Sequence, residues 1–410
     1  MSSSDPPRPS PLKNIVGGSA GNLVEWFDWY VYSAFALYFA PAFFPKADPT
    51  AQLLQTAAIF AVGFVMRPIG AWLMGIYADH RGRKAGLTLS VTLMCIGSLM
   101  IAVAPTYETV GPWAPAILLL ARMIQGLSLG GEYGSSATYM SEMADRERRG
   151  FWSSFLYVTI IGGQLSALAL LVVLQVILGD DAMQAWGWRI GFWAGALLAV
   201  VVFYIRRGLE ETRSYENVAA QKERRKSTAM NLFRDHPREA LLVMALTAGG
   251  TASFYAYTIY MQKFLANTSG FDRATASQIM TAALTVMLLI QPFAGRLSDR
   301  VGRRPLMIFF GATATLFTYP IFVTLEGTNS VAAAFALVMA ALIMVTGYTS
   351  INAIIKAELF PADIRALGVA LPYAIANAVF GGTAEYVALY LKNIGHERWF
   401  YFYISALPAI

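Results

Sequence analysis

The sequence predicts an all-α integral membrane protein with twelve membrane-spanning helices, arranged as two related six-helix halves. Hydrophobic residues occupy 56% of the 410 positions and charged residues only 14%, whereas soluble domains carry about 25% charged residues. Most of the apolar runs approach the roughly 20 residues that an α-helix needs to cross a bilayer. These runs lie at 17–44, 51–78, 87–104, 113–140, 153–178, 188–206, 240–266, 274–294, 306–325, 331–356, 366–391 and 398–410.

The same pattern predicts how the chain is divided. We expect a cytoplasmic tail at 1–16, a first six-helix half at 17–206, a charged cytoplasmic linker at 207–239 and a second six-helix half at 240–410. The tail is polar and proline-rich, unlike a signal peptide. The last apolar run is shorter than the others, so we expect the twelfth helix to be cut short.

A ten-residue motif occurs once in each predicted half. GIYADHRGRK at 75–84 and GRLSDRVGRR at 295–304 share a glycine, an aspartate four residues later, a second glycine three residues further on and two final basic residues. Glu142 precedes Arg149 by seven residues, and Glu358 precedes Arg365 by the same interval. These matched pairs indicate an internal duplication, which in so apolar a chain is typical of transporters with a site between the halves. Anchoring by positive charge would explain the basic residues but not the repeated glycines and aspartates.

The motif and the matched pairs supply a set of residues that we expect to act as a gate between conformations. They are Gly75, Asp79, Gly82, Arg83, Lys84, Glu142 and Arg149 in the first half, and Gly295, Asp299, Gly302, Arg303, Arg304, Glu358 and Arg365 in the second. The two aspartates fall at helix ends, where a carboxylate can cap a neighbouring helix or pair with arginine.

Lysine and arginine indicate the orientation. With the N-terminus inside the cell, 23 of the 31 such residues fall in cytoplasmic segments, as the positive-inside rule requires. Both termini are therefore expected in the cytoplasm, with the chain as a monomer in a bacterial inner membrane. The net charge of +6 then reflects topology and not binding to nucleic acid. With one cysteine, Cys95, and three histidines, we expect no metal site, no cofactor other than a coupling proton, and no enzymatic activity.

Several stretches resemble a known family. The ten-residue motif and RMIQGLSLGG at 122–131 resemble signatures of the major facilitator superfamily. GNLVEWFDWYVYS at 21–33, GFVMRPIG at 63–70 and KAELFPADIRALG at 356–368 resemble its metabolite–proton symporter branch. GGEYGSSATYMSEMA and AIANAVFGGTAEYVAL are similar to the members that carry α-ketoglutarate. The resemblance covers essentially the whole chain. It implies the major facilitator fold, and import of α-ketoglutarate or a similar dicarboxylate with protons by alternating access.

Charged residues inside a membrane are costly and usually functional. Glu25 and Asp28 lie three residues apart in the first helix, so we expect them on one face. A buried carboxylate beside a second one holds a proton more readily, which makes either residue a candidate proton carrier, with Asp28 favoured. Glu132, on the helix of Arg122, and Glu385 are further candidates for proton coupling. The alternative for Glu25, Asp28 and Glu385 is a permanent structural ion pair, and the alternative for Glu132 is a place in an inner gate network.

Two arginines fall at mid-membrane depth, where the substrate of such a transporter is held. Arg67 lies in the second helix and Arg122 in the fourth, and a guanidinium binds a carboxylate through two parallel hydrogen bonds. A dicarboxylate would require two such groups, or one of them with a lysine. Alternatively, the arginines neutralise Glu25 or Asp28. The other candidates for substrate binding are Gln164, Tyr255, Lys263, Lys356 and Arg189.

Alternatives remain for some of these residues and for the substrate. Arg189 could anchor the membrane interface, and Tyr255 could belong to an aromatic belt. The first alternative function is a sister proton symporter for citrate, shikimate or a zwitterion such as betaine or proline. A zwitterion would favour an aromatic cage built from Trp26, Phe27, Trp29 and Tyr30. The remote alternative is a membrane receptor that binds ligand without transporting it.

Overall fold

The prediction of an all-α fold is confirmed, because no strand occurs among the residues that the structure describes. The computed structural model describes residues 11–45, 48–81, 83–130, 148–207, 229–361 and 364–410. The helices before the linker are α1 (Pro11–Ala34), α2 (Ala36–Phe43), α3 (Pro49–Arg81), α4 (Arg83–Val103), α5 (Tyr107–Val110), α6 (Trp113–Leu129), α8 (Arg149–Ala182), the π-helical η2 (Met183–Gly187) and α9 (Trp188–Arg207).

The remaining helices repeat this plan with more interruptions. They are α11 (Ala229–Asp235), α12 (Pro237–Tyr255), η3 (Ala256–Tyr260), α13 (Met261–Asn267), α14 (Arg273–Val301), α15 (Arg303–Glu326), α16 (Val331–Thr349), α17 (Asn352–Glu358), α18 (Arg365–Ala376), η4 (Asn377–Gly381), α19 (Ala384–Asn393), α20 (Glu397–Ala406) and η5 (Leu407–Ala409). Each of the twelve apolar segments coincides, over its described residues, with one helix or with a run of linked helices.

The outer surface of the bundle suits a lipid environment. Seven helical segments among the described residues are long and apolar enough to cross a membrane, and one of them, Arg149–Tyr204, joins two predicted spans. Large side chains on outward faces, such as Trp72, Val176 and Phe293, are 67%, 75% and 72% exposed. Apolar groups on this scale face hydrocarbon readily, while the helices satisfy their own backbone hydrogen bonds.

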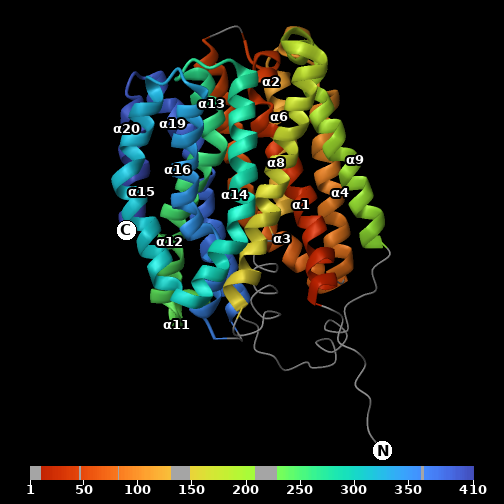
Figure 1. The fold of residues 1–410 in the computed structure, drawn as a ribbon. Helices are drawn as coiled ribbons and strands as arrows, with labels where there is room; N and C mark the ends of the chain where they lie inside the picture. Colours follow the sequence, from red (N-terminus) through yellow and green to blue (C-terminus); the bar gives the residue numbers. More distant parts are fainter. Residues whose placement is uncertain (1–10, 46–47, 82, 131–147, 208–228, 362–363) are drawn as a thin grey trace, which may run out of the picture.

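The bundle is divided along its length by two helices that run side by side. Figure 1 shows α8 and α14 at the centre, with α1, α3, α4, α6 and α9 on one side and α12, α15, α16, α19 and α20 on the other. Contacts between the two groups therefore decide which end of the bundle is open. The end at which α1 begins, drawn at the bottom of Figure 1, is called the lower end here, and the opposite end the upper end.

Two π-helical segments interrupt the second group of helices. The segment η3 joins α12 to α13, and η4 follows α18 and precedes α19. A π-helical turn inserts one extra residue and rotates everything after it, and such turns are frequent at functional sites. Lys263 lies within one turn of the end of η3, and Glu385 lies about one turn beyond the end of η4. These positions bring the two side chains together, as described below.

The repeated motif lies at the lower end in both halves. Its first copy spans the junction of α3 and α4, and its second copy spans the junction of α14 and α15. In the second junction Gly302 has φ +89° and ψ 171°, a conformation that glycine alone adopts without strain. Gly75 lies in α3, whereas the side chains of Asp79, Arg83 and Lys84 are outside the described residues, as are Gly82, Glu132 and Glu142.

Candidate functional site

A small cavity lies between the two groups of helices. Its volume is about 30 Å³, enough for one or two water molecules. Helices α1, α3 and α6 supply one wall, and α18 with the start of η4 supplies the other. The lining residues are Asn22, Glu25, Trp26, Arg67, Leu129, Gly130, Ala370, Tyr373, Ala374 and Asn377. Because both halves contribute, the cavity changes shape whenever the halves move against each other.

Arg67 is the principal cation in this cavity. Its side chain is only 7% exposed, and its guanidinium carbon lies 3.9 Å from the ring centre of Phe64, 4.2 Å from that of Trp29 and 5.1 Å from that of Trp26. Its Nε and Nη2 atoms have no hydrogen-bond partner among the described residues. Aromatic faces support a buried cation but do not satisfy its N–H donors. The arrangement therefore leaves two donors for an anionic ligand.

A second buried cation approaches the cavity from the opposite half. Lys356 on α17 is fully buried, donates to the Tyr348 hydroxyl at 3.1 Å, and lies 4.5 Å from the ring centre of Tyr373. No ion pair joins it to a carboxylate of the described residues. Tyr373 lines the cavity that contains Arg67, so it lies between the two cations. The buried Tyr255 is adjacent to Arg67, which places it in the interior and not in an aromatic belt.

Arg122 and Asp28 belong to a network within the first half. Arg122 is fully buried, with its guanidinium carbon 3.8 Å from the ring centre of Trp29. It donates to Gln125 at 2.8 Å, and the Gln125 amide donates to Asp28 at 2.8 Å. Ser98 also donates to the same carboxylate. Asp28 thus faces α4, α6 and α9, where a Cβ on Gly195 would contact it.

This network separates residues that we expected to act together. Glu25 lines the cavity, whereas Asp28 points into the helices of its own half. Residues three positions apart on a helix differ by about 60° in direction, which is enough for them to face different neighbours. Arg122, expected at the same depth as Arg67, does not line the cavity.

Lys263 and Glu385 form a buried ion pair that contacts both halves. The Lys263 Nζ lies 2.5 Å from Glu385 Oε1, and both side chains are at most 4% exposed. The ammonium also donates to Ser33 on α1 at 2.8 Å, so a residue of the first half completes the site. Removing one member of a buried pair leaves an uncompensated charge. This group of three lies nearer the upper end than the cavity does, since Ser33 follows Glu25 by about two turns of α1.

The second copy of the motif joins the two halves at the lower end. Asp299 near the end of α14 accepts hydrogen bonds from the backbone N–H groups of Gly150 at 2.7 Å and Phe151 at 2.9 Å, in the first turn of α8. Arg303 binds the same carboxylate at 2.9 Å. A carboxylate at a helix N-terminus meets both free N–H donors and the positive end of the helix dipole. A Cβ on Gly295 would lie 2.5 Å from the Gly150 carbonyl oxygen, so glycine is needed for this approach.

The remaining gate candidates are less closely engaged. Glu358 lies 4.0 Å from Arg303, and Arg365 donates to the Phe360 carbonyl at 3.3 Å. Arg304 is exposed and Arg149 is half-buried. The described members of the pairs that are seven residues apart, Arg149, Glu358 and Arg365, therefore lie at the same end of the bundle.

Two other candidates lie outside the cavity. Arg189 donates to the carbonyl oxygens of Ala102 at 2.9 Å and Ala104 at 2.7 Å, and so caps the end of α4. Gln164 on α8 donates to the Thr258 carbonyl of η3 at 2.6 Å, across the two halves. Neither residue lines the cavity that contains Arg67.

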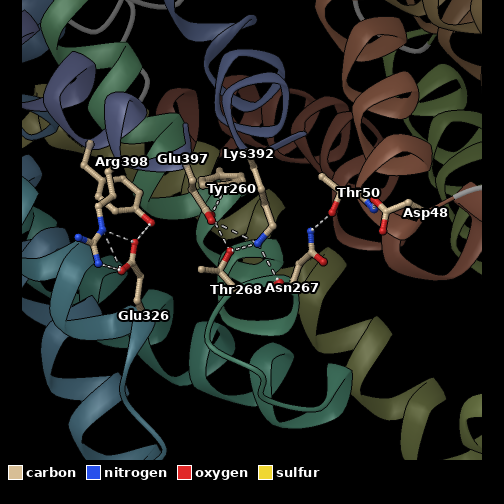
Figure 2. A network of polar contacts seen from close by, with 10 residues as sticks. Asp48, Thr50, Tyr260, Asn267, Thr268, Glu326, Lys392, Glu397 and Arg398 are labelled. Atoms are coloured by element: carbon tan, nitrogen blue, oxygen red, sulfur yellow. Dashed lines mark hydrogen bonds and ion pairs between the residues drawn. The ribbon is translucent and has the colours of Figure 1, made fainter. Parts of the chain in front are cut away.

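Polar contacts also join the halves at the upper end. Figure 2 shows Asn267 donating to Thr50 at 3.2 Å, next to a cluster in which Lys392 lies 3.4 Å from Glu397 and donates to Thr268. Among the described residues, polar contacts therefore join the two halves at both the lower and the upper end. The site residues predicted from the sequence did not include Ser33, Ser98, Tyr348 and Tyr373, or the residues of Figure 2. Isolated polar residues within apolar runs were the available signal for the first four.

Comparison with known proteins identifies the family. The sequence profile of the Major Facilitator Superfamily matches residues 19–384. The chain belongs to the major facilitator superfamily. The prediction drawn from its motifs is therefore confirmed, and so is the fold class of twelve helices in two halves.

Relatives of this superfamily member include transporters of different substrates. It is 56% identical to the alpha-ketoglutarate permease of Escherichia coli K12, over 97% of this chain and 91% of that one. It is 31% identical to the proline/betaine transporter of Salmonella typhimurium, over 97% of this chain and 81% of the other. These relatives are transporters, which confirms the prediction that the chain is not an enzyme.

Solved structures share the fold of this superfamily member. The xylose transporter XylE from E. coli, in a partially occluded inward-open conformation, aligns with a TM-score of 0.75 at 19% identity, over 97% of this chain and 96% of the other. A D-xylose–proton symporter structure aligns with the same score at 18% identity, again over 97% of this chain and 96% of that one. The family match and the apolar helices of the described residues together make the chain a multi-pass membrane protein.

Proposed function

We propose that this protein imports α-ketoglutarate, or a closely similar dicarboxylate, together with protons across a bacterial inner membrane. The observation that carries the proposal is the 56% identity to an alpha-ketoglutarate permease over nearly the whole of both chains. We further propose that the transporter works as a monomer, with both halves that line the cavity supplied by the same chain. No cofactor is required beyond the coupling proton.

Two buried cations suit a dicarboxylate. In the proposed complex, Arg67 binds one carboxylate through its two unpartnered donors. Lys356 binds the other from the opposite half. Tyr373 lies between these cations, and the Tyr255 hydroxyl lies beside Arg67. A ligand that bridges Arg67 and Lys356 draws the two halves together, which is how a midplane site drives rocking.

The aromatic residues argue against a zwitterion such as betaine. Binding a quaternary ammonium would require free faces on Trp26 and Trp29. Arg67 lies over both rings, and Arg122 lies over Trp29 as well. A betaine cation entering this cluster would meet two guanidinium groups. The geometry therefore favours an anionic substrate.

The charge of the substrate explains the need for protons. In the proposed orientation the lower end, where Arg300, Arg303 and Arg304 lie at the junction of α14 and α15, faces the cytoplasm. A charge moved against the membrane potential costs about 2.3 kcal/mol per 100 mV, so a dianion entering an inside-negative cell loses about twice that amount. Each proton carried with the dianion offsets one of its charges.

Uptake by purified protein in liposomes tests the proposal. Labelled α-ketoglutarate should accumulate when the outside is made acidic, and unlabelled α-ketoglutarate should compete better than citrate, shikimate, betaine or proline. Preferential competition by betaine would contradict the assignment of the substrate. Uptake that reaches only equilibrium under every pH gradient would contradict proton coupling.

A further inference from the structure

We propose that Glu25 carries the coupling proton, and that it does so from inside the substrate cavity. This inference rests on the proposed function, because it concerns how the same site couples protons to an organic acid. Three carboxylates are buried among the described residues, namely Glu25, Asp28 and Glu385. They differ in where they lie, and of the three only Glu25 lines the cavity that contains Arg67.

Asp28 is confined to a single half. It accepts hydrogen bonds from Ser98 on α4 and Gln125 on α6. The backbone of α9 packs against it at Gly195. Rocking of two rigid halves leaves all of these contacts in place. The conformational change therefore does not alter the access of Asp28 to water. The hydrogen bonds around Asp28 hold Arg122 in place through Gln125.

Glu385 is occupied by a partner from its own half. Its carboxylate lies 2.5 Å from the Lys263 ammonium, and protonation would leave that buried lysine without a counter-charge. Lys263 and Glu385 lie outside the cavity that contains Arg67. Proton binding at Glu385 would therefore not act on the proposed substrate site directly.

Glu25 has the required position. It is fully buried and lines the cavity shared by both halves. The surface opposite it belongs to α18, which moves with the second half. Among the described residues, the ionisable groups on the surrounding elements are Arg67 of α3, Tyr373 of α18, Tyr255 beside Arg67, and Lys356 against Tyr373. The other neighbouring helices contribute residues that do not ionise: Leu129 and Gly130 come from α6, and Thr159 of α8 contacts Asn22.

This position couples proton and substrate directly. While Glu25 is ionised, a dianion entering the cavity places like charges side by side. A proton taken from water forms an O–H bond on the Glu25 carboxyl group and removes that repulsion, so Arg67 can bind the substrate carboxylate. After the halves rock, the substrate leaves and Glu25 returns its proton to water. Because binding linkage is reciprocal, bound substrate must in turn increase the proton occupancy of Glu25.

The test compares Glu25→Gln with Asp28→Asn, a matched loss of a buried carboxylate one turn away on the same helix. In liposomes, Glu25→Gln should still exchange labelled for unlabelled α-ketoglutarate at equal pH. Its accumulation under an imposed pH gradient should fall by at least about tenfold relative to exchange. Asp28→Asn should keep the wild-type ratio of accumulation to exchange. Gradient-driven accumulation by Glu25→Gln at the wild-type ratio would overturn the proposal.

A second variant keeps the test informative in case Glu25→Gln does not fold. Glu25→Asp keeps a carboxylate in the cavity, and we expect it to accumulate substrate with a shifted pH midpoint of apparent affinity. A midpoint identical to that of the wild type would also overturn the proposal. In weakly buffered detergent, the wild type should take up protons when α-ketoglutarate is added. Failure of the wild type to transport α-ketoglutarate at all would refute the proposed function, whereas the outcomes above bear on Glu25 alone.

Discussion

Asp299 should hold the lower end of the bundle closed, and its removal should open that end. The carboxylate accepts two hydrogen bonds from the first turn of α8, and its side chain is only 8% exposed. These bonds join α14 to α8 across the halves, so they exist only while the lower end is closed. Asp299→Ala therefore destabilises the closed state, and within the second half it also removes the ion pair with Arg303.

The expected loss of free energy in the closed state follows from the two hydrogen bonds to Asp299. A hydrogen bond to a charged group contributes about 1.5–3 kcal/mol, and the lower value is suitable for a site at the edge of the bundle. Two bonds then amount to about 3 kcal/mol. Because each 1.4 kcal/mol is a factor of ten in an equilibrium constant, the population open at the lower end should rise roughly 100-fold.

Cysteine labelling measures this population. Cys95 is the sole cysteine of the chain, so a Cys95→Ala background carrying Ser154→Cys has one reactive thiol. Ser154 is fully buried on α8 against Gly295, and a maleimide reaches it only when the lower end opens. Adding Asp299→Ala should increase the labelling rate in detergent by at least about tenfold. Asp272→Ala is the matched control, since Asp272 caps the other end of α14 at Thr275. Equal labelling rates in the two variants would refute the reasoning.

Three further predictions concern the binding site, the buried ion pair and the cap of α14. Arg67→Ala should raise the concentration of α-ketoglutarate needed for half-maximal uptake by at least about 100-fold, because a bidentate charged contact is lost; normal affinity in a correctly folded variant would contradict the site. Glu385→Gln should lower stability in detergent by about 3–5 kcal/mol, and Lys263→Met in the same chain should restore most of it; additive losses in a thermal melt would show that the pair is not coupled. Hydrogen bonds from Thr275 hold the pKa of Asp272 below its usual value of 3.8. The stabilisation that the ionised Asp272 carboxylate gives to α14 is therefore fully present above pH 3.8, and it is lost as the pH falls through the lowered pKa. Asp272→Ala should therefore cost about 1 kcal/mol at neutral pH and progressively less in acid, and a difference in unfolding midpoint that persists at the lowest pH would contradict this.

Much of the fold was predictable because its causes are local. Runs of apolar residues near the length of a bilayer specify helices whatever their neighbours are. The junction at Gly302 was readable in the same way, since glycine between a helix end and a basic pair allows a tight turn. Repetition of the motif then indicated two halves, and both copies fall at the same end of the bundle.

The π-helical segments were not predictable from the residues. Nothing in the composition of η3 or η4 distinguishes them from ordinary α-helix, because the extra residue in each turn is accommodated by tertiary packing. As a result, the meeting of Lys263 with Glu385 could not be anticipated. The sequence placed both residues only as separate candidates, one for substrate binding and one for proton coupling.

The sequence by itself determined that this protein is a duplicated helical bundle in a membrane, with acids and arginines at mid-depth. Only the tertiary structure decided what those charges face. Glu25 lines the cavity while Asp28 is turned into its own half, and Arg67 lines the cavity while Arg122 is stacked on Trp29. The physical reason is angular: depth in the membrane follows from position along the helix, whereas direction differs by about 100° from each residue to the next. The neighbour that each direction meets is set by how the helices pack.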